Sequence, residues 1–187
     1  MTHKPLCGID EAGRGPLAGS LVIAGVVLKN PVEGLMDSKK LTEKKREALY
    51  PLVIKNSEYH IVSFSAQEVD AMGISQCLQQ GLQSIQKHLL EVEYLFDGNS
   101  SFGVDNIKTM IKADTKVAEV SAASILAKVT HDREMIEMAK KYPEYGFEKH
   151  KGYGTKAHME ALLKHDRCEV HRKTFRVKGL DDPVLKF

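Results

Sequence analysis

Apolar residues along the chain form short runs that predict five β-strands. The first run, 6–9, is separated by a glycine-rich segment from a β-branched run at 21–28, and this pair predicts a hairpin. A third segment, 59–64, alternates between polar and apolar residues as a half-buried strand does. Two further runs, 93–97 and 106–111, each lead into an aspartate-containing turn and complete the set.

Polar residues that cap helices stand between the later strands. Thr42 is placed to cap a helix from about Glu43. Pro51 is expected to end or kink this helix, because a proline in a helix interior has no N–H to donate. Ser65 and Glu68 have the spacing of a capping box, which predicts that a second helix starts there.

Two longer helices follow from the spacing of apolar residues. Gly73 interrupts the second helix, and Ser75 is expected to cap the next one. The apolar face of that helix has 4-3-4 spacing: Leu78, Leu82, Ile85 and Leu89. The longest helix is predicted over 115–141, before Pro143, and its narrow face of mostly small residues suits close packing on a sheet: Ala118, Ala122, Ile125 and Val129.

The C-terminal quarter of the chain is basic and only partly patterned. A glycine-containing loop is expected at 148–156, and Thr155 can cap a last helix. The inward residues of that helix are predicted to be Met159, Leu162 and Leu163. We expect one domain that spans residues 1–187, of which roughly residues 143–187 form a basic C-terminal part.

The order of the predicted elements assigns the chain to the α/β class. The early strands are joined by short turns, which indicates antiparallel pairing. The later strands alternate with helices, which indicates parallel pairing. A mixed central sheet flanked by helices satisfies both patterns.

Composition narrows the class of protein. The chain has 187 residues, of which 42% are hydrophobic and 28% charged, an ordinary balance for a soluble domain. No apolar run approaches the ~20 residues that span a bilayer, and the first residues lack a signal-peptide core. We therefore expect a cytoplasmic protein without a membrane partner. The formal charge of +2 says little, but lysine and arginine are dense over 140–178, which favours a nucleic-acid partner.

The cysteines and histidines do not form a metal motif. Cys7, Cys77 and Cys168 are scattered and odd in number, which argues against disulfides and zinc and favours reduced, packed thiols. The spacing of the C-terminal histidines matches no zinc signature either, so surface or capping roles are expected for them: His150, His158, His165 and His171.

Acidic residues stand where three of the predicted strands end. These residues are Asp10 and Glu11, Asp97, and Asp114. Carboxylates at neighbouring strand ends can converge, and such hard oxygen ligands suit Mg²⁺ or Mn²⁺. Each acid also has a structural alternative, because Asp97-Gly98 is a favoured turn and Asp114 could cap the long helix. Asp10 and Glu11 would point to opposite faces of a regular strand, so a bulge or strand end is needed to bring both to one metal.

An arginine between two glycines follows the first acids. Gly13, Arg14 and Gly15 form a turn that a phosphate can approach closely, because no Cβ atoms stand beside the arginine. The glycines also fit a dinucleotide-binding pattern, but that pattern must open a helix, and Pro16 is followed by a β-branched run instead. A P-loop is excluded because the chain has no Gly-Lys-Ser/Thr triplet.

The acids and the glycine turn lie in motifs that resemble the type 2 ribonucleases H, and most closely ribonuclease HII. The resemblance recurs in order from Gly8 to about Phe175 and rests on four segments: 8–19, 95–98, 112–117 and 121–129. The related ribonuclease HIII usually has lysine at the position of Arg14 and a sizeable N-terminal domain. This chain has arginine there and only seven residues before Gly8, which favours the HII subtype.

The resemblance implies a ribonuclease H-like fold and a two-metal endoribonuclease. The expected reaction is hydrolysis of the RNA strand of RNA/DNA hybrids and cleavage 5′ of single ribonucleotides in duplex DNA, leaving 5′-phosphate and 3′-hydroxyl ends. The implied catalytic and metal-binding residues are Asp10, Glu11, Asp97 and Asp114, with Mg²⁺ or Mn²⁺ as cofactor. The implied substrate-binding residues are Gly13, Arg14, Gly15, Lys39 and Tyr153. A monomer is expected.

Two other functions remain open from the residues alone. A noncatalytic nucleic-acid-binding module could keep the fold and the basic loop, but four acids beside a phosphate site would disfavour binding without metal chemistry. A ribonuclease H-like nuclease that acts on DNA is the other alternative, and the Arg14 turn and Tyr153 argue against it.

Overall fold

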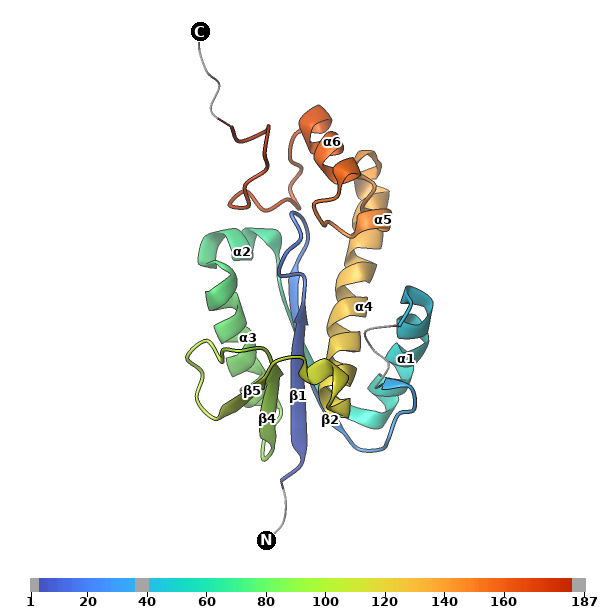
Figure 1. Ribbon diagram of the computed structural model, residues 1–187, viewed down its shortest axis with the longest axis vertical. Helices are drawn as coiled ribbons and strands as arrows, with labels where there is room; N and C mark the ends of the chain where they lie inside the picture. Colours follow the sequence, from blue (N-terminus) through green and yellow to red (C-terminus); the bar gives the residue numbers. More distant parts are fainter. Residues whose placement is uncertain (1–3, 36–40, 183–187) are drawn as a thin grey trace.

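The computed structural model describes residues 4–35 and 41–182, which fold as a sheet enclosed by helices (Figure 1). The strands are β1 (Leu6–Ala12), β2 (Leu21–Leu28), β3 (Ser57–Phe64), β4 (Glu93–Asp97) and β5 (Ile107–Met110). The helices are α1 (Glu43–Asn56), α2 (Ala66–Met72), α3 (Ile74–His88), α4 (Ala118–Lys141), α5 (Phe147–His150) and α6 (Lys156–His165), with 3₁₀ turns η2 (Ala113–Thr115) and η3 (Pro143–Tyr145).

The sheet is mixed, as the sequence predicts. Its order is β3-β2-β1-β4-β5, so β1 is the central strand. The first three strands pair antiparallel in sequence order, whereas β4 pairs parallel to β1, and β5 pairs parallel to β4. Helices α2 and α3 lie between β3 and β4 and bring the chain back beside its first strand, whereas β4 and β5 are joined without a helix.

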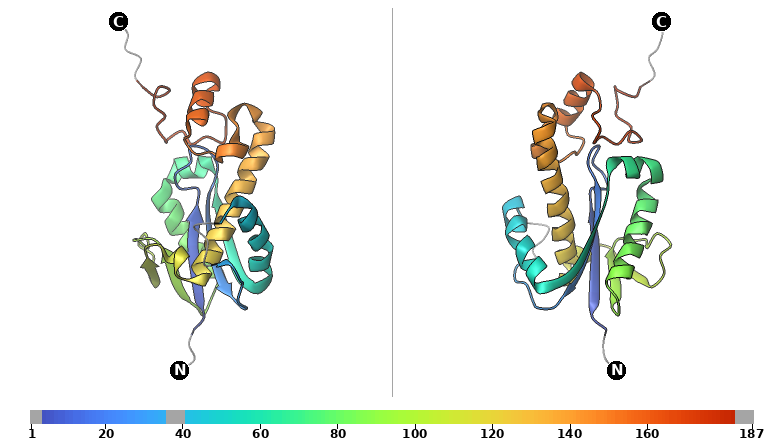
Figure 2. Two further views of the ribbon diagram at one scale, coloured as in Figure 1. Left: turned by 45° about the vertical axis from the view of Figure 1, so that its right-hand side comes forward. Right: turned by 180° about the vertical axis from the view of Figure 1, so that it is seen from behind.

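Helices cover both faces of the sheet, and the two layers are visible from behind in Figure 2. Strand β2 is buried on both faces, since every residue from Leu21 to Val27 is buried. This burial explains why its sequence is apolar without alternation. Alternate β2 side chains join the core beside α3: Leu21, Ile23 and Val27. The intervening ones join the core beside α1 and α4: Val22, Ala24 and Val26.

Helix α4 approaches β1 unusually closely at Gly8. A Cβ atom placed on Gly8 would lie 2.2 Å from the main-chain carbon of Glu119, so no other residue fits without a shift. Buried alanines on the same helix, Ala122 and Ala123, keep the rest of the contact short. The predicted small-residue face therefore exists, and it packs against the strand that carries the first two acids.

The C-terminal part packs across the far end of α4, where α5 and α6 stand beyond the end of the sheet (Figure 1). A separate apolar cluster holds it there, and its buried members include Met135, Tyr145, Phe147 and Leu162. Within the described part of the chain, no helix is long and apolar enough to cross a membrane.

Pro51 does not end α1, which was the first of the two effects expected of it. The helix continues to Asn56. Pro51 lies on the exposed side, while Leu49 and Val53 on either side of it are buried. Packing of these two side chains holds the helix together across the missing hydrogen bond. The Thr42 cap is confirmed, because its side chain accepts from the N–H of Lys45.

Three helix details also differ from the prediction. Helix α3 begins at Ile74 with Gly73 at its N-cap, so Ser75 lies inside the first turn and does not cap it. The long helix begins at Ala118 because residues Ala113–Thr115 form a separate 3₁₀ turn. Leu163 is 54% exposed, since the buried face of α6 is set by His158 and Leu162, four residues apart.

Replacing Gly8 with alanine tests the contact between β1 and α4. The added methyl group would meet main-chain atoms that cannot rotate away, so Gly8→Ala is expected to lower the free energy of unfolding by about 1–3 kcal/mol. Urea unfolding followed by circular dichroism measures this loss. Gly154→Ala is the matched control, because its nearest neighbour would be a leucine methyl at 3.3 Å. Equal stability of Gly8→Ala and wild type would contradict the contact.

Candidate active site

Asp10 and Glu11 lie within the central strand, not after its end. Strand β1 continues to Ala12, with Asp10 opposite Ala24 and Glu11 opposite Ile23 in uninterrupted register, so the expected bulge or early strand end is absent. The other edge of β1 differs, because its pairing with β4 stops at Ile9. The two acids thus stand on opposite faces of a strand whose neighbour on one side has ended its ladder.

Asp97 ends β4 and is held by the main chain of the following turn. Its carboxylate oxygens accept from the N–H of Lys112 at 3.0 Å and of Asp114 at 3.1 Å. Lys112 takes a left-handed conformation with φ of 60°, which lets the chain turn into η2. These two bonds fix the orientation of the Asp97 carboxylate and draw the segment that carries Asp114 back to the end of β4.

The four acids share one electrostatic environment. Burial, followed by the charges of Glu11, Asp97 and Asp114, raises the pKa of Asp10 well above its usual range. Burial and Asp97 also raise the pKa of Glu11, although the Arg14 guanidinium opposes this. Carboxylates gathered from three separate segments therefore repel one another in a poorly solvated place, which is typical of a functional site.

The donors at this site fit a hard divalent cation. All four are carboxylates, and Glu11 Oε2 is buried without a hydrogen-bond partner among the described residues. The other oxygen, Oε1, forms an ion pair of 2.6 Å with Arg14. In this arrangement no three acidic, histidine or cysteine side chains of the described residues gather closely enough to hold a metal. One carboxylate oxygen of Glu11 is instead paired with Arg14.

The Gly13–Gly15 turn follows β1 directly. Gly13 has φ of 87°, and a Cβ there would lie 2.2 Å from the carbonyl oxygen of Ser20, so both conformation and space require glycine. Arg14 is half exposed and lies over the ring of Phe102 at 5.7 Å. The turn thus presents main chain and one guanidinium to the surface beside the acids.

Tyr153 folds back onto this turn from far along the chain. Its ring carbon Cε1 would lie 3.9 Å from a Cβ on Gly15. Tyr153 is 39% exposed, its ring makes a T-shaped contact with the ring of His131, and Lys128 Nζ lies over it at 5.3 Å from the centroid. The loop thus brings a partly exposed aromatic side chain next to the glycine turn.

Arg172 contacts the glycine turn, although no pattern in the sequence marks it. Its side chain is buried, and it donates to main-chain carbonyls of Gly13, Arg14 and Gly19. In the sequence it is one of many basic residues in a weakly patterned tail. Lys39 of the predicted site lies outside the described residues.

Two of the C-terminal histidines are buried, which excludes the surface alternative of the surface or capping roles expected for them. His158 and His171 are at most 2% exposed, and their Nε2 atoms lie 3.0 Å apart. Burial lowers the pKa of each to about 4, so both are neutral at physiological pH. His158 Nδ1 lies 2.9 Å from the Tyr153 carbonyl, and His171 Nδ1 accepts from the N–H of Cys168. The pair is a neutral internal link between the Tyr153 loop and the C-terminal segment.

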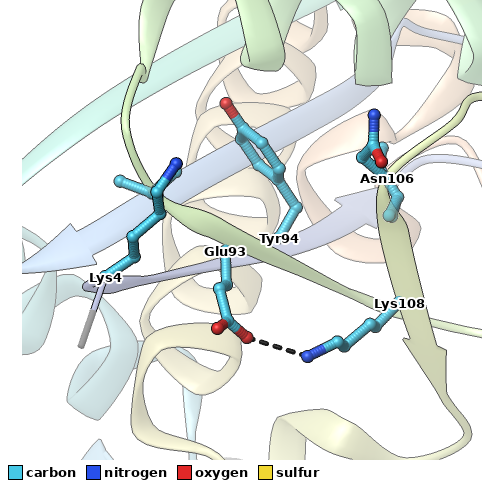
Figure 3. A pocket seen from close by; sticks show the side chains of 7 residues that line it. Lys4, Glu93, Tyr94, Asn106 and Lys108 are labelled. Carbon is cyan, nitrogen blue, oxygen red and sulfur yellow. Dashed lines mark hydrogen bonds and ion pairs between the residues drawn. The ribbon is translucent and has the colours of Figure 1, made fainter. Parts of the chain in front are cut away.

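A shallow hollow at the opposite end of the sheet lies apart from the four acids and the glycine turn. It has a volume of about 420 Å³ and lies where β4 and β5 begin, whereas Asp97 lies where β4 ends. Figure 3 shows Glu93 and Lys108 joined across it by an ion pair of 2.8 Å. Its lining has no cluster of acids, which separates it from the candidate active site.

Sequence comparison places the chain beside one family over nearly its whole length. The Ribonuclease HII family model matches residues 7–178. Ribonuclease HII of Sulfurovum sp. is 78% identical over 182 residues, covering 97% of each chain. Ribonuclease HII of Campylobacter jejuni is 55% identical over 173 residues, covering 92% of this chain and 91% of the relative.

Solved structures show the same architecture. Ribonuclease H2 of Pyrococcus horikoshii aligns with a TM-score of 0.78 and 29% identity, covering 92% of this chain and 94% of that one. The ribonuclease HII of Archaeoglobus fulgidus, solved in complex with PCNA, aligns with a TM-score of 0.77 and 26% identity over 96% of this chain and 98% of its own. The predicted ribonuclease H-like α/β fold is confirmed.

Replacing Asp10 with asparagine tests the repulsion among the acids. The folded protein raises the pKa of Asp10 above the 3.8 of an unfolded aspartate, so it binds that proton more tightly than the unfolded chain does. Stability is therefore lost as the pH rises above about 3.8. In chelator, Asp10→Asn is expected to raise the free energy of unfolding at pH 7 by on the order of 1 kcal/mol, and by less at pH 4.

Denaturant unfolding at the two pH values measures this difference. The exposed Asp105 supplies a matched control, since Asp105→Asn changes the same functional group away from the acidic cluster. A variant at Asp10 that is no more stable than wild type at pH 7 would count against the shared environment of the acids.

Proposed function

This chain belongs to the ribonuclease HII family and is a ribonuclease H, and on that premise we propose its substrates, cofactors and site residues. It hydrolyses the RNA strand of RNA/DNA hybrids and cleaves 5′ of single ribonucleotides embedded in duplex DNA. The products carry 5′-phosphate and 3′-hydroxyl ends. The observation that carries this proposal is that the charges of Glu11, Asp97 and Asp114 all act on Asp10, beside an arginine turn between two glycines and a partly exposed tyrosine.

In this proposal the four carboxylates hold the metals. Asp10 and Asp97 are the central ligands, and Glu11 and Asp114 complete the two sites. Mg²⁺ or Mn²⁺ suits an all-oxygen donor set, and a divalent cation would relieve the repulsion that raises the pKa of Asp10. When bound, two such ions activate water and stabilise the leaving oxygen of a phosphodiester. Asp97 is ready for this role because two N–H groups already fix its carboxylate.

The Gly13–Gly15 turn is proposed to bind the ribonucleotide. Main-chain groups that stand clear of side chains can approach a 2′-hydroxyl and the adjacent phosphate, and the 2′-hydroxyl is what separates RNA from DNA. Arg14 contributes a guanidinium that is now paired with Glu11. Release of that pair would supply a carboxylate to the metals and a cation to the phosphate at the same time. Lys39 is proposed as a further phosphate contact.

Tyr153 is proposed to distinguish deoxyribose from ribose in the nucleotide that follows the ribonucleotide. Its exposed ring stands beside Gly15, so it can press on the next nucleotide of the same strand. A 2′-hydroxyl on that sugar would crowd the ring, whereas deoxyribose would not. Residues 143–187 thereby form a substrate-contacting part. Because all of the proposed site residues come from one chain, a monomer suffices for activity. The proposed site of action is the cytoplasm.

The first test is cleavage of a DNA duplex that contains one ribonucleotide, with Mg²⁺, Mn²⁺ or chelator. Cleavage is expected only with metal. Mapping of the ends should give a 5′-phosphate on the ribonucleotide and a 3′-hydroxyl on the deoxynucleotide that precedes it. Asp97→Asn is expected to abolish cleavage while leaving hybrid binding in place, since a ligand is lost but the acceptor oxygen for Lys112 remains. The all-DNA duplex is the substrate control, and Asp105→Asn is the variant control. Near-normal cleavage by Asp97→Asn would remove its assigned role.

A second test concerns Tyr153. Tyr153→Ala is expected to lose about 1–3 kcal/mol of transition-state stabilisation on the single-ribonucleotide duplex and less on a continuous hybrid. Tyr153→Phe is expected to lose less than alanine on both, because the ring makes the contact. Tyr59→Ala, which removes a similarly exposed tyrosine from β3, is the control. Rates at subsaturating substrate measure these losses, and equal losses on the two duplexes would refute sensing of the junction.

A further inference from the structure

The Arg172 guanidinium lies directly behind the glycine turn. Nη2 donates to the carbonyl oxygens of Gly13 at 2.5 Å and Gly19 at 2.9 Å. Nη1 donates to the carbonyl of Arg14 at 3.2 Å, and Nε donates to that of Gly19 at 3.1 Å. The planar guanidinium thus binds three main-chain carbonyl groups at once. Its Cζ atom lies 4.9 Å from the centroid of the Phe175 ring.

This grip determines where the amides of the turn point. In a trans peptide the C=O and N–H groups point in opposite directions, and the described chain has no cis peptide. The carbonyls of Gly13 and Arg14 turn inward to Arg172, so the N–H groups of Arg14 and Gly15, which share those peptides, turn outward. Among the described residues, neither of these two N–H groups donates to a main-chain carbonyl. Two consecutive outward N–H groups form a concave donor pair suited to an anionic or hydroxyl oxygen.

We propose that Arg172 is a positioning residue, which holds the Arg14 and Gly15 amides outward as a donor pair for the ribose 2′-hydroxyl and adjacent phosphate. The assignment rests on the proposed function, because it takes the RNA/DNA substrate from there. It adds the residue that shapes the substrate turn without touching the substrate.

The charge of Arg172 supports a role beyond packing. Within the described residues no carboxylate forms an ion pair with it, and burial lowers its pKa to about 10, so it is still cationic at neutral pH. A cation on the carbonyl side of a peptide polarises that peptide and strengthens its N–H as a donor. Its positive charge also lies beneath the place where a phosphate would sit.

Other contacts already join the two segments without the guanidinium. The N–H of Leu17 donates to the Gly152 carbonyl, that of Gly19 to Val170, and that of Arg172 to Leu17. Ala18 and His171 also form a β-bridge. These main-chain bonds remain when the Arg172 side chain is replaced, so a variant can keep the fold while the turn loses its orientation.

The experiment compares binding to an RNA/DNA hybrid and to the all-DNA duplex of the same sequence, in chelator so that no cleavage occurs. Arg172→Met and Arg172→Lys are both expected to lower the preference for the hybrid by about tenfold or more, since methionine lacks donors and a single ammonium cannot span three carbonyls. Affinity for the all-DNA duplex should change little.

Arg167→Met is the matched control. Arg167 lies five residues earlier in the same segment, pairs with Asp181, and has no contact with the carbonyl groups of the Gly13–Gly15 turn. Its loss should therefore lower the melting temperature without changing the hybrid preference. A wild-type hybrid preference that is unchanged in both Arg172 variants would overturn this inference alone. A wild type that neither prefers nor cleaves the hybrid would overturn the proposed function instead.

A measurement on wild type covers the case in which the Arg172 variants do not fold. Amide nitrogen and proton shifts are recorded while the protein is titrated with the hybrid and with the all-DNA duplex. The Arg14 and Gly15 amides are expected to move downfield with the hybrid and much less with DNA. Unmoved Arg14 and Gly15 signals in the presence of saturating hybrid would overturn the proposal.

Discussion

The repulsion among four partly buried carboxylates beside the central strands is the interaction on which the candidate site depends. Asp10 stands in a strand covered by helices on both faces, where burial and three neighbouring acids oppose its ionisation. The fold tolerates this because close packing elsewhere is strong, as at Gly8 against Glu119. A stable scaffold thus holds a locally unfavourable charge arrangement, which a bound cation would convert into a favourable one.

The site is assembled from both ends of the chain. Strands β1 and β4 and the 3₁₀ turn η2 carry the acids, and the C-terminal part brings the Tyr153 ring and the Arg172 guanidinium to the same glycine turn. The buried pair His158 and His171 links these two contributions through hydrogen bonds to the Tyr153 carbonyl and the Cys168 N–H. In the proposed function, the sheet side of the Gly13–Gly15 turn therefore carries the chemistry, and the turn together with the C-terminal part carries the recognition of substrate.

The sequence predicted elements well where local rules decide them. The apolar run of β2, the capping box at Ser65 and the small-residue face of α4 were all readable, since each depends on spacing within one segment. The prediction was wrong where a short helix leaves little room for a second inward side chain, as at Leu163. At Pro51 the packing of neighbouring side chains decides that the helix continues, which the local preference alone did not settle.

The candidate acids and Tyr153 could be named from motifs, but their relations could not. The sequence cannot show that Asp97 is fixed by the N–H groups of Lys112 and Asp114, because main-chain donors carry no side-chain signature. It also gives no reason to choose Arg172 among the basic residues of its segment. That choice depends on a contact between positions 159 residues apart.

That separation has a consequence for the order of folding. The strands and α4 can form their shared core from segments that lie closer together in the chain, whereas the turn at Gly13 reaches its final shape only after the largest loop has closed. Contacts of such long range carry the largest loop-closure cost, which slows their formation. The turn that is proposed to recognise the ribonucleotide would then take its final shape late in folding, after the sheet.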